Sequence, residues 1–290
     1  MLRVAVLLAA TPVAPAAANL NPCFSGRPLM GNPCLKPGSN FSKLRYCDAT
    51  APLEERIADA VSHMSLPEKI GALGTVWPVT PSLGLDCYNW YTEATSGVAW
   101  AHCGACKTTK FAFPITLAQS WNRTLWQLTG RQIGREARAL MNEGDGYSTF
   151  WAPVINLARE PRWGRNLECP GEDPRLSGSY AESFVTGFQV APEDPHHLQA
   201  SACCKHIVAN SMEQTTEPDG ESENRGAVDE NITMQDLVDS YLPPFNDCVQ
   251  KGNVSGLMCS YNAVNGKPTC ADDWLLTTVA RDNWKFDGCE

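Results

Sequence analysis

Apolar side chains recur at helical spacing from residue 51 onward, after a stretch that has no periodic pattern. The spacing predicts a helix capped by Thr50, because an N-cap hydroxyl accepts a hydrogen bond from the first turn. Ser65 and Glu68 form a capping box, which predicts that a second, short helix begins there. The recurring apolar positions of the first helix are Leu53, Ile57, Ala60, Val61 and Met64.

Farther along, segments with helical spacing alternate with short apolar runs. Helices are predicted over residues 123–142, 179–189, 233–251 and 272–284. Strands are predicted over residues 149–157, 199–204 and 254–260. Strands that alternate with helices pair in parallel through right-handed crossovers. The predicted fold class is therefore α/β, with a (β/α) TIM-type barrel favoured over an open doubly wound sheet, since the chain lacks a glycine-rich phosphate-binding motif.

The first fifty residues indicate secretion. Residues 1–18 have a basic start, a short apolar run and small residues at their end, which is the pattern of a signal peptide. Residues 19–50 are rich in Pro, Gly and Asn and are predicted to form a cysteine-containing irregular arm. The 13 cysteines of the chain would be unusual in a reducing cytosol. Four N-glycosylation sequons begin at Asn40, Asn122, Asn231 and Asn253. We expect a secreted, extracellular, disulfide-bonded glycoprotein.

The charge and the hydropathy of the chain limit the kinds of partner that we expect it to bind. The formal net charge is −9, whereas proteins that bind nucleic acid need a basic surface. The apolar run at residues 4–10 is too short to span a bilayer, and no other stretch is long enough. We therefore expect neither a nucleic-acid partner nor a membrane span, and the oligomeric state stays open.

Four polar clusters carry the candidate chemistry. One lies in the aromatic-rich stretch 88–93, and three follow predicted strands, at residues 159–165, 205–206 and 260–262. Ligand-handling residues of a barrel lie at the carboxyl ends of its strands, so we expect these clusters to meet. Aromatic faces stack on sugar rings, while arginine, lysine and carboxylate groups bind hydroxyls. Taken alone, three of the clusters also fit a structural role: residues 159–165 as a surface salt-bridge cluster, residues 205–206 as a turn cap and residues 88–93 as aromatic packing.

Four sequence blocks resemble glycoside hydrolase family 3, especially its β-xylosidase-like branch in plants and fungi. They occur in family order and at family-like intervals. The blocks are residues 88–94 (YNWYTEA), 159–165 (REPRWGR), 204–210 (CKHIVAN) and 257–266 (LMCSYNAVNG). The resemblance implies that residues 51–290 form part of the amino-terminal catalytic barrel of this family. It also implies a secreted, retaining, exo-acting β-glycosidase that releases xylose or glucose from β-linked plant-type oligosaccharides.

The resemblance implies roles for individual residues of this chain. Glu93 matches the family carboxylate that grips hydroxyls of the non-reducing sugar. Lys205 and His206 match the paired donors to the hydroxyls of that sugar. Tyr261 matches the tyrosine beside the nucleophile. These four residues are therefore expected to bind substrate.

Arg165 matches the family arginine that reaches the same sugar, with Arg162 as a supporting neighbour in substrate binding. At three places near these substrate-binding residues, the sequence departs from the family pattern. Glu160 stands where the family has Asp, residues 95–96 (TS) replace Leu-His, and Tyr91 replaces a Trp. The acid-rich stretch 213–223 also replaces a more aromatic loop. These changes leave the reaction class intact and leave the sugar specificity open.

The catalytic carboxylates are expected outside this chain. The resemblance implies that the nucleophilic Asp lies a few residues beyond Glu290 and that the acid/base residue belongs to a later domain. Neither Asp287 nor Glu290 replaces them, because a terminal residue lacks a scaffold that holds it within catalytic tolerance. We expect a carboxy-terminally truncated, incomplete barrel that is inactive by itself. No cofactor is expected, since catalysis by two carboxyl groups needs none.

Other interpretations of the sequence lead to different tests. His102, Cys103 and Cys106 offer metal-type ligands, but one such cluster is incomplete for structural zinc, and secretion favours disulfides, so no metal site is expected. A non-catalytic sugar-binding glycoprotein would keep the substrate-binding residues without turnover. A cysteine-tied structural wall protein would show no saturable affinity for monosaccharides. The choice among xylose, glucose and arabinose stays open, and so does the disulfide pairing.

Overall fold

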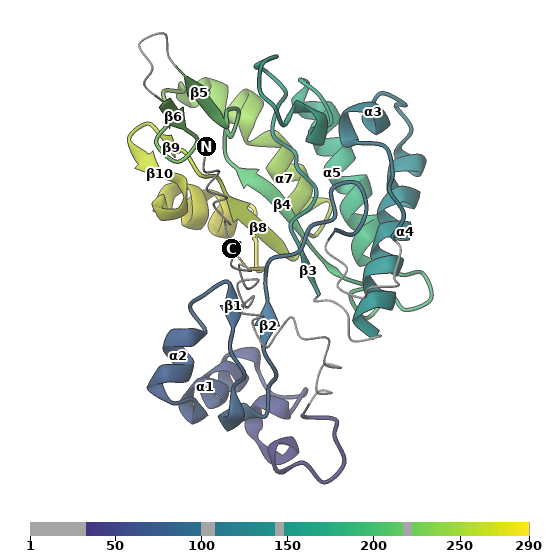
Figure 1. Ribbon diagram of the computed structural model, residues 1–290, viewed down its shortest axis with the longest axis vertical. Helices are drawn as coiled ribbons and strands as arrows, with labels where there is room; N and C mark the ends of the chain where they lie inside the picture. Colours follow the sequence, from purple (N-terminus) through teal and green to yellow (C-terminus); the bar gives the residue numbers. More distant parts are fainter. Residues whose placement is uncertain (1–32, 100–107, 143–147, 217–221, 290) are drawn as a thin grey trace, which may run out of the picture.

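The structure is a computed structural model that describes residues 33–99, 108–142, 148–216 and 222–289 (Figure 1). The predicted signal peptide, the first part of the arm, the cluster at residues 102–106 and Glu290 lie outside the described residues.

Helices and short strands alternate along the described residues. The α-helices are α1 (Leu53–His63), α2 (Leu66–Gly71), α3 (Pro114–Ala118), α4 (Arg123–Asn142), α5 (Pro174–Gln189), α6 (Met234–Asp236) and α7 (Pro243–Gln250). Two π-helical segments are η6 (Leu237–Tyr241) and η8 (Trp274–Asn283). Short 3₁₀ helices are η2 (Asn40–Lys43), η3 (Arg45–Cys47), η4 (Pro81–Leu83), η5 (Asn166–Glu168) and η7 (Thr269–Ala271). The strands are β1 (Val76–Trp77), β2 (Tyr88–Asn89), β3 (Thr149–Phe150), β4 (Ser201–Ile207), β5 (Gln214–Thr216), β6 (Ser222–Asn224), β7 (Asp229–Glu230), β8 (Gly256–Cys259), β9 (Ala263–Val264) and β10 (Lys267–Pro268).

A parallel sheet with the order β3-β4-β8 forms the centre of the fold (Figure 1). Strand β4 lies in the middle, with Phe150 beside Ala202 on one side and Gly256 beside Cys203 on the other. The predicted strand at residues 149–157 is regular only over β3, because Pro153 has no N–H to donate to the ladder. Hydrogen bonds to β4 continue beyond β3: the Cys203 N–H donates to the Ala152 carbonyl at 3.0 Å, and the Ile155 N–H donates to the Lys205 carbonyl at 2.9 Å. The parallel pairing is as predicted.

Helices α4, α5 and α7 cover this sheet, and α4 packs closely along α5 (Figure 1). Glycines make the close packing possible: a Cβ at Gly187 would lie 2.1 Å from the main-chain oxygen of Gln127, and one at Gly130 would lie 2.4 Å from that of Phe184. Aromatic side chains fill the space between these helices and the sheet. The largest of them, each almost fully buried, are Trp126, Tyr180, Phe184, Phe188 and Phe245. The predicted helices 123–142 and 179–189 are confirmed, although α5 begins at Pro174, capped by Asp173.

The first helices form a separate layer near β1 and β2 (Figure 1). The capping box of Ser65 and Glu68 is present, as predicted. The predicted cap of α1 is wrong: Pro52 is the N-cap residue, and the Thr50 hydroxyl bonds to Asp48 at 2.6 Å instead. No residue of α1 is buried, so its apolar side chains face outward in the structure.

The predicted helix over residues 233–251 consists of three segments. Helix α6 leads into the π-helical η6, and α7 begins at Pro243, the position of the expected bend. The predicted helix 272–284 is η8, which is also π-helical. A π turn is wider than an α turn, and the spacing of apolar residues does not distinguish the two.

Disulfides tie neighbouring elements together. Within the described residues the pairs are Cys34–Cys47 in the arm, Cys204–Cys248 between β4 and α7, and Cys259–Cys270 after β8. Among the helices of the described residues, none combines the length and the apolar character that a bilayer crossing needs.

Candidate functional site

A pocket of about 500 Å³ lies at the carboxyl ends of β4 and β8, and its volume falls within the range of small-molecule sites. Strand β4 and the segments that follow β2, β3 and β8 all contribute to its wall. Five of the six residues predicted to bind substrate line it, namely Glu93, Arg165, Lys205, His206 and Tyr261. The barrel rule that predicted their meeting therefore describes this structure correctly.

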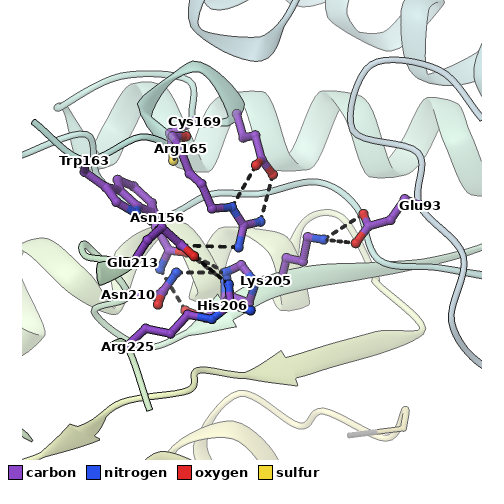
Figure 2. A network of polar contacts seen from close by, with 11 residues as sticks. Glu93, Asn156, Trp163, Arg165, Cys169, Lys205, His206, Asn210, Glu213 and Arg225 are labelled. Atoms are coloured by element: carbon purple, nitrogen blue, oxygen red, sulfur yellow. Dashed lines mark hydrogen bonds and ion pairs between the residues drawn. The ribbon is translucent and has the colours of Figure 1, made fainter. Parts of the chain in front are cut away.

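An ion pair between Lys205 and Glu93 forms the floor of the pocket. The Lys205 ammonium donates to both carboxylate oxygens of Glu93, at 2.6 and 2.7 Å, although the two residues are 112 positions apart (Figure 2). The Lys205 side chain is 2% exposed and that of Glu93 is 21% exposed. Burial raises the pKa of Glu93 and lowers that of Lys205, and the charge of each partner opposes the shift of the other. A bidentate contact of this length favours the charged pair.

His206 is a neutral donor and acceptor group beside this pair. Its main-chain N–H donates to the Asn156 side-chain oxygen at 2.8 Å, and its ring Nδ1 lies 3.2 Å from the same oxygen (Figure 2). Burial, together with the charges of Lys205 and two arginines, holds the pKa of His206 well below its usual value. The imidazole therefore stays uncharged at neutral pH and keeps one N–H for donation.

Arg165 is held from two sides. Its Nε and Nη2 donate to the two carboxylate oxygens of Glu168, at 2.7 and 2.8 Å, one turn away in η5. A second carboxylate, that of Glu213, lies 3.6 Å from its Nη1 (Figure 2). Burial alone would lower the pKa of Arg165, but these carboxylates raise it, so the guanidinium remains charged. A rigid, charged donor fork is thus fixed at the pocket wall.

Aromatic and cationic groups complete the wall. The Tyr261 ring lies 5.5 Å from the His206 ring, and the Arg225 guanidinium lies 3.7 Å from the centre of the Tyr261 ring. The sequence did not single out Arg225, nor Lys110, whose ammonium contacts the Ser96 hydroxyl. Arg225 is the first basic residue after the acid-rich stretch 213–223, and that contrast was the available signal.

Arg162 is not part of this pocket, in contrast to the prediction. Its side chain is 89% exposed, and its Nε donates to Glu160 at 2.7 Å. The two arginines of the block differ because η5 begins directly after Arg165 and turns that side chain inward, whereas Arg162 lies in the preceding exposed turn. The hydrogen bonds from Arg162 lower the pKa of Glu160 to about 2. The departures at residues 95–96 and at Tyr91 do line the pocket.

No group of three or more His, Cys, Asp or Glu side chains that could hold a metal ion occurs among the residues that the structure describes.

Comparison with known proteins identifies the family. A family model described as the glycosyl hydrolase family 3 N terminal domain matches residues 93–289. The chain belongs to glycoside hydrolase family 3. A β-xylosidase/α-L-arabinofuranosidase from Medicago sativa subsp. varia is 42% identical over 257 residues, which cover 86% of this chain and 33% of that protein. β-D-xylosidase 3 from Arabidopsis thaliana is 41% identical over 265 residues, covering 89% of this chain and 33% of that protein.

Solved structures of family 3 enzymes show the fold. An exo-β-xylosidase in complex with a xylobiose aziridine probe matches with a TM-score of 0.78 and 33% identity, over 85% of this chain and 32% of that chain. β-Glucosidase 3B from Thermotoga neapolitana in complex with α-D-glucose matches with a TM-score of 0.60 and 34% identity. This match covers 72% of the present chain and 27% of the β-glucosidase chain. The predicted TIM-type barrel, present here in part, is thus confirmed. The family 3 chain described here spans about a third of the length of these relatives.

Proposed function

We propose that this chain supplies the sugar-binding pocket of a secreted, retaining, exo-acting β-glycosidase that hydrolyses O-glycosyl bonds in plant-type oligosaccharides. β-Xylosidase is the favoured activity and β-glucosidase comes next. The observation that carries the proposal is the convergence of Glu93, Arg165, Lys205, His206 and Tyr261 on one pocket of a family 3 fold.

The chemistry of the pocket suits a neutral sugar. Glu93 accepts hydrogen bonds from hydroxyls while it remains paired with Lys205. Arg165 and His206 donate to hydroxyl oxygens, and the Tyr261 ring offers an apolar face to a pyranose. The buried cations Lys205 and Arg165 are paired with Glu93 and Glu168, so an uncharged ligand with many hydroxyls can bind without leaving either cation unpaired.

Cleavage by the retaining mechanism needs two carboxyl groups about 5–5.5 Å apart, one of them a nucleophile. Among the described residues, the carboxylates that line the pocket are Glu93 and Glu168, and both are held by cations. A carboxylate in a bidentate ion pair is a poor nucleophile. The proposal therefore assigns the nucleophile to an Asp beyond Glu290 and the acid/base residue to a later domain, with substrate binding left to this chain.

The preference for xylose rests on relatives. Proteins of Medicago sativa subsp. varia and Arabidopsis thaliana that are 40–42% identical to this chain carry β-xylosidase names. Secretion and glycosylation are also part of the proposal. They are supported by the disulfides of the described residues and by the exposure of the sequon residues Asn40, Asn122, Asn231 and Asn253.

Titration calorimetry of the full chain with xylose, glucose and arabinose tests the binding part of this proposal. Saturable binding of xylose is expected, with Lys205→Met at least about tenfold weaker. Glu160→Gln is the matched control, because Glu160 pairs with exposed Arg162 outside the pocket. No binding of any of the three sugars, or equal binding by Lys205→Met, would overturn it.

The catalytic part of the proposal is tested by sequencing the transcript beyond the codon for Glu290 and then assaying the protein that it encodes. If it encodes a further strand with Ser-Asp, the whole protein is expected to hydrolyse an aryl β-xyloside to xylose and the aryl alcohol, and Asp→Asn at that position should abolish hydrolysis. A stop codon there would favour the second candidate function, a non-catalytic sugar-binding glycoprotein or an inactive fragment. The observation in favour of that candidate is the pairing of both lining carboxylates.

A further inference from the structure

Glu213 contacts two cations of the pocket without lining it. One carboxylate oxygen accepts a hydrogen bond from Arg225 Nη1 at 2.7 Å. The other accepts one from the Trp163 indole N–H at 3.3 Å and lies 3.6 Å from Arg165 Nη1. Figure 2 shows the carboxylate between the two guanidinium groups.

The hairpin of β5 and β6 fixes this geometry. Gln214 pairs with Asn224, and the Arg225 main-chain N–H donates to the Glu213 carbonyl at 2.8 Å, so the two residues face each other directly beyond the paired strands. Glu213 thus connects the hairpin to the segment after β3, which carries Trp163 and Arg165.

The Arg225 guanidinium depends on this carboxylate for its orientation. An arginine side chain has many rotamers, and ordering it has an entropic cost that a short ion pair offsets. The same guanidinium stacks on the Tyr261 ring at 3.7 Å, so its position also defines the aromatic wall of the pocket. Arg165 depends less on Glu213, since Glu168 already binds it through two hydrogen bonds.

We propose that Glu213 is a positioning residue that holds Arg225, and secondarily Arg165, with their guanidinium groups facing the bound sugar. It acts through the arginines and does not touch the ligand. The identity of the ligand rests on the proposed function, whereas the ordering of Arg225 does not.

Exposure separates this role from simple stabilisation. The side chains of Glu213 and Arg225 are 31% and 33% exposed, so their ion pair contributes little to the stability of the fold. Glu213→Gln should therefore weaken sugar binding while the melting temperature stays near that of wild type. Glu160→Gln is the matched control, since it removes a Glu–Arg pair that lies outside the pocket.

The first measurement is the ¹⁵N relaxation of the Arg225 Nε–H group in the full chain, with the resonance assigned from its loss in Arg225→Lys. The heteronuclear NOE should be that of an ordered side chain in wild type and in Glu160→Gln, and should fall to that of a mobile one in Glu213→Gln. Glu213→Asp keeps the charge and should restore part of the order. An unchanged NOE in Glu213→Gln would overturn the proposal, whether or not the chain binds sugar.

The second measurement is the xylose Kd by calorimetry. Glu213→Gln should raise the Kd about tenfold. When Arg225 is already replaced by Met, adding Glu213→Gln should raise the Kd by less than about threefold, which is half of the first effect on a logarithmic scale. Full additivity, or a Kd within twofold of wild type, would refute a role through Arg225. If wild type binds no xylose, the proposed function fails, while the NOE comparison still decides the role of Glu213.

Discussion

Replacing Glu93 with Gln would leave Lys205 as a buried ammonium group whose counter-ion is gone. In the native chain the ammonium lies 2.6 and 2.7 Å from the two Glu93 oxygens, and its side chain is 2% exposed. Gln keeps the size of the side chain and one oxygen acceptor but removes the negative charge. We therefore expect a large fall in the free energy of unfolding, because a buried charge without a partner is strongly destabilising.

The size of the effect has an upper bound. Breaking a buried ion pair from one side costs about 3–5 kcal/mol. The lysine can also escape the penalty by losing its proton, and neutralising an ordinary lysine costs about 4.6 kcal/mol at pH 7 and about 1.9 kcal/mol at pH 9. Burial lowers the pKa of Lys205 even beside Glu93, and loss of this carboxylate lowers it further, so the cost approaches these bounds without exceeding them. The expected loss is about 3–4 kcal/mol at pH 7 and under about 2 kcal/mol at pH 9.

The sign of the pH dependence follows from proton linkage. In Glu93→Gln the folded state binds the lysine proton more weakly than the unfolded state does, so stability rises with pH up to the unfolded pKa of lysine. Urea unfolding followed by circular dichroism, at pH 7 and pH 9, measures this difference against wild type. Glu160→Gln is the control, because its charge pair is exposed and should change stability by less than about 1 kcal/mol.

A double variant sharpens the test. Glu93→Gln combined with Lys205→Met removes both charges, and it should be more stable than Glu93→Gln alone, because no ion is then left unpaired. The reasoning is refuted if Glu93→Gln costs less than about 1 kcal/mol at pH 7, if its cost is the same at pH 9, or if the two substitutions are additive.

Three further outcomes are expected. Burial and neighbouring cations hold the pKa of His206 well below its usual value, so the stability of wild type should fall as pH falls below about 6.5. The expected loss is up to about 1.4 kcal/mol per pH unit. The His206→Gln variant should show a weaker pH dependence in urea titrations. Removing the disulfide with Cys204→Ala and Cys248→Ala should cost about 4 kcal/mol in the same assay, given the sequence separation of 44, and an effect below about 1 kcal/mol would contradict it. Gly187→Ala should cost at least about 1–3 kcal/mol, because its Cβ meets a main-chain oxygen of α4, whereas Gly164→Ala meets open space and should be nearly neutral by thermal melting.

The pocket could be predicted from the sequence because several of its residues lie at or just after the carboxyl ends of predicted parallel strands. Lys205 and His206 lie near the end of β4, and Tyr261 lies just after β8, so parallel pairing alone brings them together. Arg165 lies farther from its strand β3, and its hydrogen bonds to Glu168 of η5 hold it at the pocket. Binding of sugar by these residues stays a prediction, and the Lys205→Met variant tests it for Lys205.

The interactions that the sequence did not reveal are those fixed by long-range packing. Glu213 and Arg225 belong to a stretch without periodicity. Glu213 contacts Trp163 and Arg165, about fifty positions earlier, whereas Arg225 contacts Glu213 and Tyr261. The sequence alone does not distinguish the environment of Arg162 from that of Arg165. The turn into η5 decides which of the two side chains faces the pocket. The disulfide partners also required the fold, because thirteen cysteines permit many pairings.

The glycine contacts between α4 and α5 give the outer layer of the fold an unusual stiffness. Side chains that interdigitate can change rotamer and let two helices slide, whereas main chain packed on main chain has no rotamers to change. The two helices should therefore move as one body, and their amide hydrogens should exchange with solvent in a single cooperative opening. Strand β4 packs against α5, so any movement that admits a ligand to the pocket should come from the segments at the carboxyl end of β4.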